Sequence, residues 1–245
     1  MLKPGSGPLW HGEWDEVVMI HFAVRPEVLQ QHVPFELDVW EGEAFVSAVA
    51  FTLRGMKMKG RFGWLSPLIR PFVSHPFLNL RTYVRHAGES GIYFLAEWVP
   101  WVPTLLMARP MYGLPYRPGR LRYRHDVKSG HVSGQVRSDW GGGVLNYEGV
   151  FRGKPEAAEA GSLTEFLMER YTAFTQWKQR TKRFRVWHPP WLQQEIEVKI
   201  PTRTLLSETG DWADDARFMN AHASPGLPMV WMGAPDGLEL GRDLG

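Results

Sequence analysis

The segment LNLRTYVRHAGESGIYFLAEW, residues 78–98, decides the fold class, because it contains two strand-like runs joined by a turn. Leu78–Arg85 and Ile92–Trp98 are rich in the β-branched, aromatic and large apolar side chains typical of strands. The HAGESG stretch between them contains the glycines and the serine that favour a reversal of the chain. The segment therefore predicts an antiparallel β-hairpin.

One face of the first strand in this hairpin is polar. Alternate residues of a strand share a face, so Asn79, Arg81 and Tyr83 point to one side and the residues between them to the other. A polar face lies either against water or against an interior pocket. In a pocket, the guanidinium of Arg81 would need an anionic partner, because an unpaired buried charge is costly. The strand alone leaves both alternatives open.

Further strands are expected on both sides of the hairpin. They are Val17–Val24, Glu43–Leu53, Leu121–Val127, His131–Ser138, Val144–Phe151, Arg183–His188, Glu195–Ile200 and Ala216–Ala221. Turn signals at residues 128–130 and 141–143 join the three middle strands of this series into an antiparallel meander. Arg120, Arg122 and Arg124 alternate at its start, which is typical of a solvated sheet face.

Helices are few. A short helical run is expected from Pro26 to Gln31, and Pro34 stops it. The clearest helix begins at Ser162, where the letters SLTE offer a capping box. Apolar residues recur behind it at helical spacing, at Leu163, Phe166, Leu167, Tyr171, Phe174 and Trp177. We therefore expect this helix to continue through the whole stripe, with the stripe packed in the core.

About ten strands with one good helix favour a mainly β (α+β) fold, an antiparallel β-barrel or cone with a few peripheral helices. The sequence has 245 residues, and an all-β fold of this size is normally one unit. We expect residues 1–245 to form a single domain.

The composition argues against several classes of protein. With 28 basic and 26 acidic side chains, the net charge of +2 implies no general attraction to nucleic acid. The absence of cysteine excludes disulfides, a thiol nucleophile and thiolate metal sites. No stretch approaches the ~20 apolar residues of a membrane span, so we expect a cytoplasmic protein with no membrane partner. The patterns HExxH and GxGxxG are also missing, and we expect no metal and no cofactor.

The stretch ARPMYGLPYR, residues 108–117, resembles the active-site loop of acetoacetate decarboxylases. In that loop an arginine and a glutamate precede a proline and two lysines, and the first lysine forms a Schiff base with the substrate ketone. Arg109 and Pro115 match, whereas Tyr116 stands at the Schiff-base position and Arg117 at its neighbour. A phenol cannot form an imine and Arg117 stays protonated, so Schiff-base chemistry is not expected here.

The resemblance extends over most of the chain. It includes FLNLRTYV from Phe77, GIYFL from Gly91, PEVLQQHVP from Pro26, His21 and HASPGLPM from His222. Together these segments are similar to the YqjF-like uncharacterised family, domain of unknown function 2071, in the acetoacetate decarboxylase-like superfamily. Members often carry a glutamate two residues before the asparagine of LNLRTYV, where this chain has Phe77.

This resemblance implies an interior pocket and assigns candidate residues to it. It places the strand of Arg81 against the interior, where Arg81 would bind a substrate carboxylate through paired hydrogen bonds. Asn79 and Tyr83 would supply neutral hydrogen bonds. His21 and His222 are expected near the same pocket, or else serve as hydrogen-bonded core residues.

Tyr116 is the candidate catalytic residue, because it stands in the place of the nucleophilic lysine and can donate a hydrogen bond or transfer a proton. Its unperturbed pKa is ~10, so proton transfer near neutral pH would need a nearby cation such as Arg117 or Arg81. The alternative is that Tyr116 only fills the space of the lysine. Arg109 is expected to hold the loop through a salt bridge, with Glu97 as its partner and as the nearest catalytic carboxylate.

Two functions remain open at this stage. The first is an enzyme, a lyase or isomerase for a small oxo or carboxylic acid, with Tyr116 and Glu97 catalytic and Arg109 and Arg117 among the substrate-binding residues. The second is a non-catalytic module that binds or senses such an acid on the same fold. Binding of nucleic acid through the arginine clusters is a third, weaker alternative, and a homodimer is compatible with the many tryptophans.

Overall fold

The computed structural model describes residues 8–58, 74–100, 111–126, 129–177 and 180–238. Its strands are β1 (Trp10–Val24), β2 (Glu36–Leu37), β3 (Ala44–Met58), β4 (His75–His86), β5 (Glu89–Val99), β6 (Tyr116–Asp126), β7 (His131–Ser138), β8 (Val144–Phe151), β9 (Glu156–Ala157), β10 (Thr172–Trp177), β11 (Arg180–Trp187), β12 (Leu192–Arg203), β13 (Arg217–Met232) and β14 (Asp236–Leu238). Its helices are α1 (Pro26–Leu29), α4 (Leu163–Met168) and α5 (Trp212–Asp215), with 3-10 turns η1 (Gln30–His32) and η4 (Leu206–Thr209).

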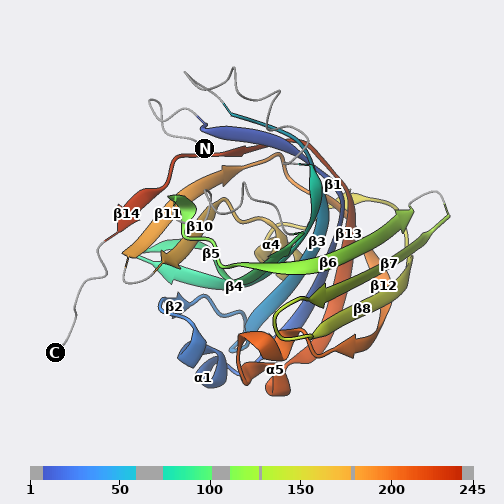
Figure 1. Cartoon of the computed structure of the whole chain (residues 1–245), viewed down its shortest axis with the longest axis horizontal. Helices are drawn as coiled ribbons and strands as arrows, with labels where there is room; N and C mark the ends of the chain where they lie inside the picture. Colours follow the sequence, from blue (N-terminus) through green and yellow to red (C-terminus); the bar gives the residue numbers. More distant parts are fainter. Residues whose placement is uncertain (1–7, 59–73, 101–110, 127–128, 178–179, 239–245) are drawn as a thin grey trace.

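Strand pairing closes the curved sheet into a cone-like ring (Figure 1). Around the ring the order is β13, β1, β3, β4, β5, β10 and β11, and β11 pairs again with β13. A second path runs from β5 through β6, β7, β8 and β12 back to β13, and we call these four strands the outer layer. Strands β13, β1, β3, β4 and β5 belong to both paths, and we call them the shared wall.

The shared wall is covered on both of its faces. Side chains on one face, such as Met19, Val49 and Phe77, pack in a core inside the ring. Side chains on the other face, such as Ile20 and Leu80, pack in a second core against the outer layer and the short helices. Long strands with two buried faces explain why residues 77–84 of β4 are all buried.

The mainly β, cone-like fold confirms the expectation from sequence. Leu78–Arg85 and Ile92–Trp98 form the antiparallel hairpin β4–β5, with Leu78 opposite Trp98. The predicted meander is β6–β7–β8, and His131–Ser138 and Val144–Phe151 match their strands residue for residue. Two short pairings, β5 with β6 and β5 with β10, are parallel in an otherwise antiparallel sheet.

The helix at Ser162 is real but much shorter than predicted. The hydroxyl of Ser162 accepts a hydrogen bond from the backbone N–H of Glu165 at 3.2 Å, which confirms the cap. The predicted continuation to Trp177 is wrong, because residues 172–177 form strand β10 between β11 and β5. Sheet pairing with distant strands therefore overrides the apolar spacing, which local periodicity cannot anticipate.

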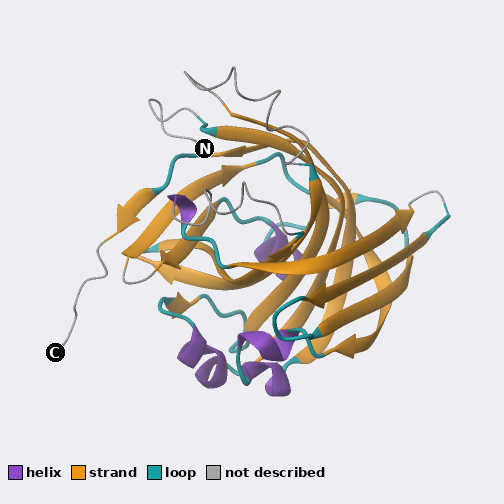
Figure 2. Ribbon diagram, in the orientation of Figure 1, coloured by secondary structure: helices purple, strands orange, loops and turns teal. Residues whose placement is uncertain are grey.

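The helices α1, α4 and α5 lie in two places (Figure 2). Figure 2 shows α1 and α5 together at one end of the molecule, while α4 is seen through the ring. Among the described residues, no helix has the length and apolar character needed to cross a membrane.

Candidate functional site

Strand register aligns polar side chains in two rows on the ring face of the shared wall. The first, the cation row, consists of His21, Ser47 and Arg81, which are register partners on β1, β3 and β4. The second, the acid row, consists of His222, Asn79, Glu97 and Tyr116, linked in register through Met19 and Val49 across β13, β1, β3, β4, β5 and β6. Register partners in a sheet point to the same face, so both rows look into the ring.

The cation row is tied to α4 by a chain of hydrogen bonds. The hydroxyl of Tyr83 donates to the carbonyl of Leu167 at 2.8 Å. Because Tyr83 has only one proton to give, it accepts from the hydroxyl of Ser47 at 2.6 Å, and Ser47 in turn accepts from Nδ1 of His21 at 2.7 Å. The chain therefore fixes neutral His21 with its proton on Nδ1 and a lone pair on Nε2.

Arg81 is a buried cation, with 4% of its surface exposed. Its Nη2 donates to the carbonyl of Leu167 at 3.1 Å and lies 3.8 Å from the sulfur of Met19. Among the described residues no carboxylate pairs with Arg81, whereas the neighbouring buried Arg170 has Asp38 at 2.9 Å. A buried guanidinium without a carboxylate carries an uncompensated desolvation cost, so an anion beside it would be strongly favoured.

The two histidines of the rows are neutral near pH 7. Burial lowers the pKa of His21 well below its usual value, and nearby His222 and Arg81 lower this pKa further. Burial also lowers the pKa of His222 to about 4. The ring centroids of these histidines are 5.2 Å apart, so a charge on one disfavours a charge on the other. Arg81 is therefore the lasting positive charge of the two rows.

Glu97 and Tyr116, at the end of the acid row away from His222, are uncharged proton donors. Glu97 is 5% exposed, and burial raises the pKa of its carboxyl group to about 8. Burial, with Glu97 and Tyr112 nearby, raises the pKa of the Tyr116 phenol well above its usual value. This shift takes the pKa of Tyr116 away from the neutral range that proton transfer would need. Glu97, not Tyr116, titrates near neutral pH.

Several buried polar atoms of these rows have no hydrogen-bond partner among the residues that the structure describes. They are Nε2 of His21, Nδ1 of His222, Oδ1 of Asn79, Nε of Arg81 and Oε2 of Glu97. Buried polar atoms in native proteins are nearly always paired, and each exception calls for an explanation. Five exceptions on one face of one wall favour a polar binding site over a simple structural core.

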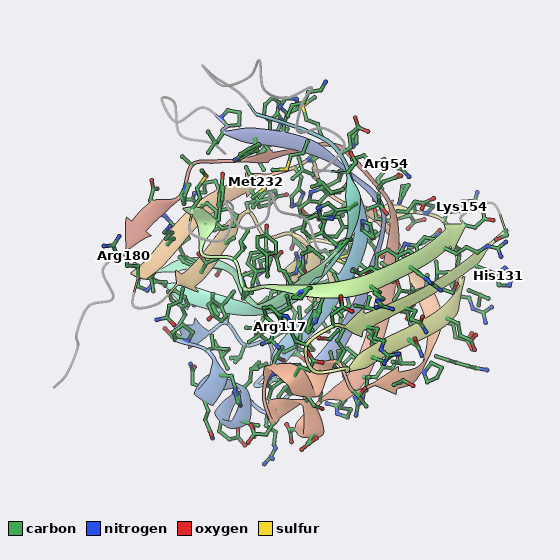
Figure 3. All side chains as sticks on the ribbon, in the orientation of Figure 1. Arg54, Arg117, His131, Lys154, Arg180 and Met232 are labelled. Atoms are coloured by element: carbon green, nitrogen blue, oxygen red, sulfur yellow. The ribbon has the colours of Figure 1, made fainter. Side chains whose placement is uncertain are left out.

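Arg117, a predicted substrate-binding residue, is not brought together with the others. Neighbouring residues of a strand point to opposite faces, and Arg117 points away from the ring while Tyr116 points into it. The guanidinium of Arg117 donates to the carbonyl of Glu208 at 2.9 Å and lies 5.7 Å from the ring of Trp98, toward η4 and α5 (Figure 3). Arg109, the expected partner of Glu97, lies outside the described residues.

Sequence reasoning missed Ser47 and the contribution of α4. Ser47 carries a readable signal, because it alternates with Val49 and Phe51 and so breaks an otherwise apolar strand face. The contacts from α4 carry no sequence signal, because they join segments far apart in the chain. The carbonyl of Leu167 accepts a hydrogen bond from Arg81, 86 residues away, and the hydroxyl of Thr164 lies 3.5 Å from Nε2 of His222.

The hollows described on the surface lie elsewhere, on the solvent side of the outer layer. One of about 590 Å³ is lined by residues including Arg124 and Lys199, and one of about 450 Å³ by residues including Arg120 and Trp140. We base the candidate site on the buried polar rows, because these hollows are open and far from them. Within the described ranges, no three metal-binding side chains cluster. His131 is exposed at the far end of the outer layer (Figure 3), whereas His125 on the paired strand β6 is buried.

The fold is that of the acetoacetate decarboxylase-like proteins. An acetoacetate decarboxylase-like enzyme from Sphingomonas wittichii superposes with a TM-score of 0.64 at 15% identity, covering 98% of this chain and 97% of that one. The acetoacetate decarboxylase of Legionella pneumophila gives 0.62 at 12% identity, over 95% and 86% of the two chains. The enduracididine biosynthesis enzyme MppR complexed with pyruvate gives 0.59 at 16% identity, over 97% and 91%.

Within this fold, the chain belongs to the family of uncharacterised conserved proteins called domain of unknown function 2071, whose model matches residues 11–228. The uncharacterised protein YqjF of Bacillus subtilis is 29% identical over 201 residues, which cover 80% of each chain. The resemblance noted from the sequence is thereby confirmed.

Proposed function

We propose that the cation and acid rows bind a small oxo or carboxylic acid, with its carboxylate on Arg81. One observation carries the proposal: Arg81 is a buried cation that, among the described residues, has no carboxylate beside it and no partner for its Nε. A ligand carboxylate would supply the missing charge and accept from two nitrogens of the guanidinium. The lone pair that the hydrogen-bond chain leaves on Nε2 of His21 stays free for a donor group of the ligand.

The acid row suits a second, uncharged oxygen of the same ligand. With a pKa of about 8, Glu97 is mostly protonated at pH 7 and can donate from its carboxyl group. Tyr116, its register partner, offers a neutral phenol. A carbonyl oxygen held by these donors explains why two acidic groups are buried beside each other without a cation among the described residues.

The same groups support proton transfer without an amine. The ionised fraction of Glu97 would take a proton from the carbon beside the ligand carbonyl, the C–H electron pair would form a C=C bond, and the π pair of the carbonyl would move onto its oxygen. Tyr116 would stabilise the resulting enolate by donating a hydrogen bond. Return of the proton to a different atom completes an isomerisation. A carboxyl pKa near neutrality is what such a base needs.

A non-catalytic acid-binding module is the second candidate. It is favoured by Tyr116, which stands where the resembling enzymes have their reactive lysine and which stays protonated near neutral pH. In this alternative, the rows bind the acid by the same contacts and Glu97 serves only as a hydrogen-bond donor.

Thermal unfolding with pyruvate and a series of other oxo and carboxylic acids tests binding. A ligand at 100 times its dissociation constant adds ~2.7 kcal/mol, which raises the midpoint by roughly 5 to 10 °C. We expect this shift in the wild type and in Arg122→Met, a matched control on the exposed face of β6, and no shift in Arg81→Met. Equal shifts in all three proteins would contradict the proposal.

Proton exchange separates the enzyme from the module. In D2O, an enzyme should exchange the protons beside the ligand carbonyl, and proton NMR would show the loss of their signal. Glu97→Gln should abolish the exchange while leaving binding largely intact. Binding without exchange in the wild type would favour the module.

A further inference from the structure

A third row of side chains, entirely aromatic, continues the ring face of the shared wall beyond the acid row. Phe51 and Phe77 are register partners on β3 and β4, and their rings stack at 5.2 Å with an interplanar angle of 5°. Trp14 stacks on Phe51 at 4.6 Å and 24°. Phe51 and Phe77 are buried in the same core as Met19 and Val49. We call Trp14, Phe51 and Phe77 the aromatic row.

The three rows follow one another in a fixed order along the strands. On β4 the ring-facing residues are Arg81, Asn79 and Phe77, each two positions apart, so neighbouring rows are ~7 Å apart. On β3 the corresponding residues are Ser47 and, four positions on, Phe51. The wall therefore changes from a cation to neutral hydrogen-bonding groups and then to stacked rings, over ~14 Å.

The acid row and the aromatic row are in contact. The ring centroid of Tyr116 lies 6.5 Å from that of Phe77, while its register partner Glu97 belongs to the acid row. His75 also stacks with Phe77, with ring centroids 4.5 Å apart and an interplanar angle of 24°. The polar rows are thus followed by a continuous aromatic surface, which suits edge-to-face contact with another ring.

We infer that the preferred ligand is an aryl-substituted oxo acid, with its carboxylate on Arg81, its carbonyl oxygen at Glu97 and Tyr116, and its ring against Phe77. This inference rests on the proposed function and adds the substrate class to it. Phe77 is then a specificity-determining residue. A short acid such as pyruvate fills only the two polar rows and leaves the aromatic row unused.

Isothermal titration calorimetry with pyruvate, phenylpyruvate and 4-phenyl-2-oxobutanoate tests the inference, because these acids share one head group. Burial of a phenyl group contributes roughly 1.5 to 3 kcal/mol, which corresponds to a dissociation constant about 10- to 100-fold lower for the aryl acids. Phe77→Leu should reduce this preference by about 5-fold or more and leave the pyruvate constant unchanged. Phe174→Leu makes the same change in the other core and should leave the preference intact.

The outcomes are distinguishable. If pyruvate binds as tightly as the aryl acids, or if Phe77→Leu leaves the ratio unchanged, the inference is overturned while the proposed function stands. If no acid binds, or if binding survives Arg81→Met, the proposed function fails and the inference falls with it. Phe51→Leu removes the stacking partner of Phe77 and replaces Phe77→Leu if circular dichroism shows that variant to be unfolded.

Discussion

Strands β4 and β6 each carry an arginine on a face that alternates with an opposite face, yet Arg81 of β4 and Arg122 of β6 have opposite environments. Arg81 on β4 is 4% exposed, whereas Arg122 on β6 lies on an exposed face. The difference comes from the layers: β4 belongs to the shared wall, which is covered on both faces, and β6 belongs to the outer layer, which is covered on one. Alternation therefore shows which residues share a face, but not whether that face is covered.

The two environments also differ in the desolvation cost of a polar group and in what that group contributes to stability. On the outer layer, exposed Arg120 pairs with Asp139 at 3.4 Å, and such surface pairs contribute little to stability. On the buried face of the shared wall, charges and hydrogen bonds such as those of Arg81 and Tyr83 are removed from water, so each one affects the free energy of unfolding or the pKa of a neighbour. Equivalent substitutions on the shared wall and on the outer layer should therefore change the free energy of unfolding by very different amounts.

The largest contrast is expected between Glu97→Gln on the wall and Glu148→Gln on the exposed face of β8. Burial raises the folded-state pKa of Glu97 to about 8, above its ordinary value of 4.5. The folded state therefore binds more protons between these values, and stability is lost at ~1.4 kcal/mol per pH unit as pH rises through this window. At pH 9 the loss is on the order of 5 kcal/mol, and Glu97→Gln should remove it.

Urea unfolding of the wild type and both variants at pH 5, 7 and 9 measures this effect. Glu97→Gln should gain stability over the wild type as the pH rises, and Glu148→Gln should follow the wild type at every pH. Parallel curves for all three proteins would show that Glu97 is not shielded from water.

A smaller contrast is expected between Tyr83→Phe on the wall and Gln135→Ala on the exposed face of β7. Tyr83 is fully buried, and its hydroxyl bonds both Ser47 and the carbonyl of Leu167. Its loss should cost ~1 to 3 kcal/mol, because buried partners are left unpaired. Gln135→Ala should stay within about 0.5 kcal/mol. Chemical denaturation measures both, and equal costs would show that the chain to α4 adds no stability.

The smallest contrast should be a gain in stability, whereas most substitutions of buried residues destabilise a protein. Arg81→Met removes a buried charge that no described carboxylate pairs, and the carbonyl of Leu167 keeps the hydrogen bond from Tyr83. We expect the free energy of unfolding to rise by on the order of 1 kcal/mol while acid binding is lost. Arg122→Met should change neither quantity measurably. A clear loss of stability in Arg81→Met would mean that the guanidinium is held for structural reasons.

Much of the fold could be predicted because its signals are local. The hairpin of residues 78–98, the meander and the cap at Ser162 each depend on residues a few positions apart. The extension of the helix to Trp177 failed for the opposite reason, since Phe174 pairs with Tyr93 and Arg183 far away in sequence. The spacing of apolar residues contains no information on sheet pairing with distant segments of the chain.

The candidate site was predictable only in part. Family resemblance led to Arg81, Asn79, Glu97, Tyr116, His21 and His222. The structure aligns five of them on the shared wall, and Tyr116 pairs in register with Glu97 from the adjoining strand β6. Strand parity alone would have separated Tyr116 from Arg117, because adjacent residues of a strand face opposite ways. Ser47 could also have been read from its alternation, whereas the carbonyl of Leu167 could not.

The sequence by itself determined which residues are extended, where the chain turns and which side chains share a strand face, because these depend on propensities and on the two-residue period of a strand. Only the tertiary structure decided that the face with Arg81 is covered and the face with Arg122 is not. It also decided that Glu97 keeps its proton near neutral pH, because burial depends on what other segments place over a strand.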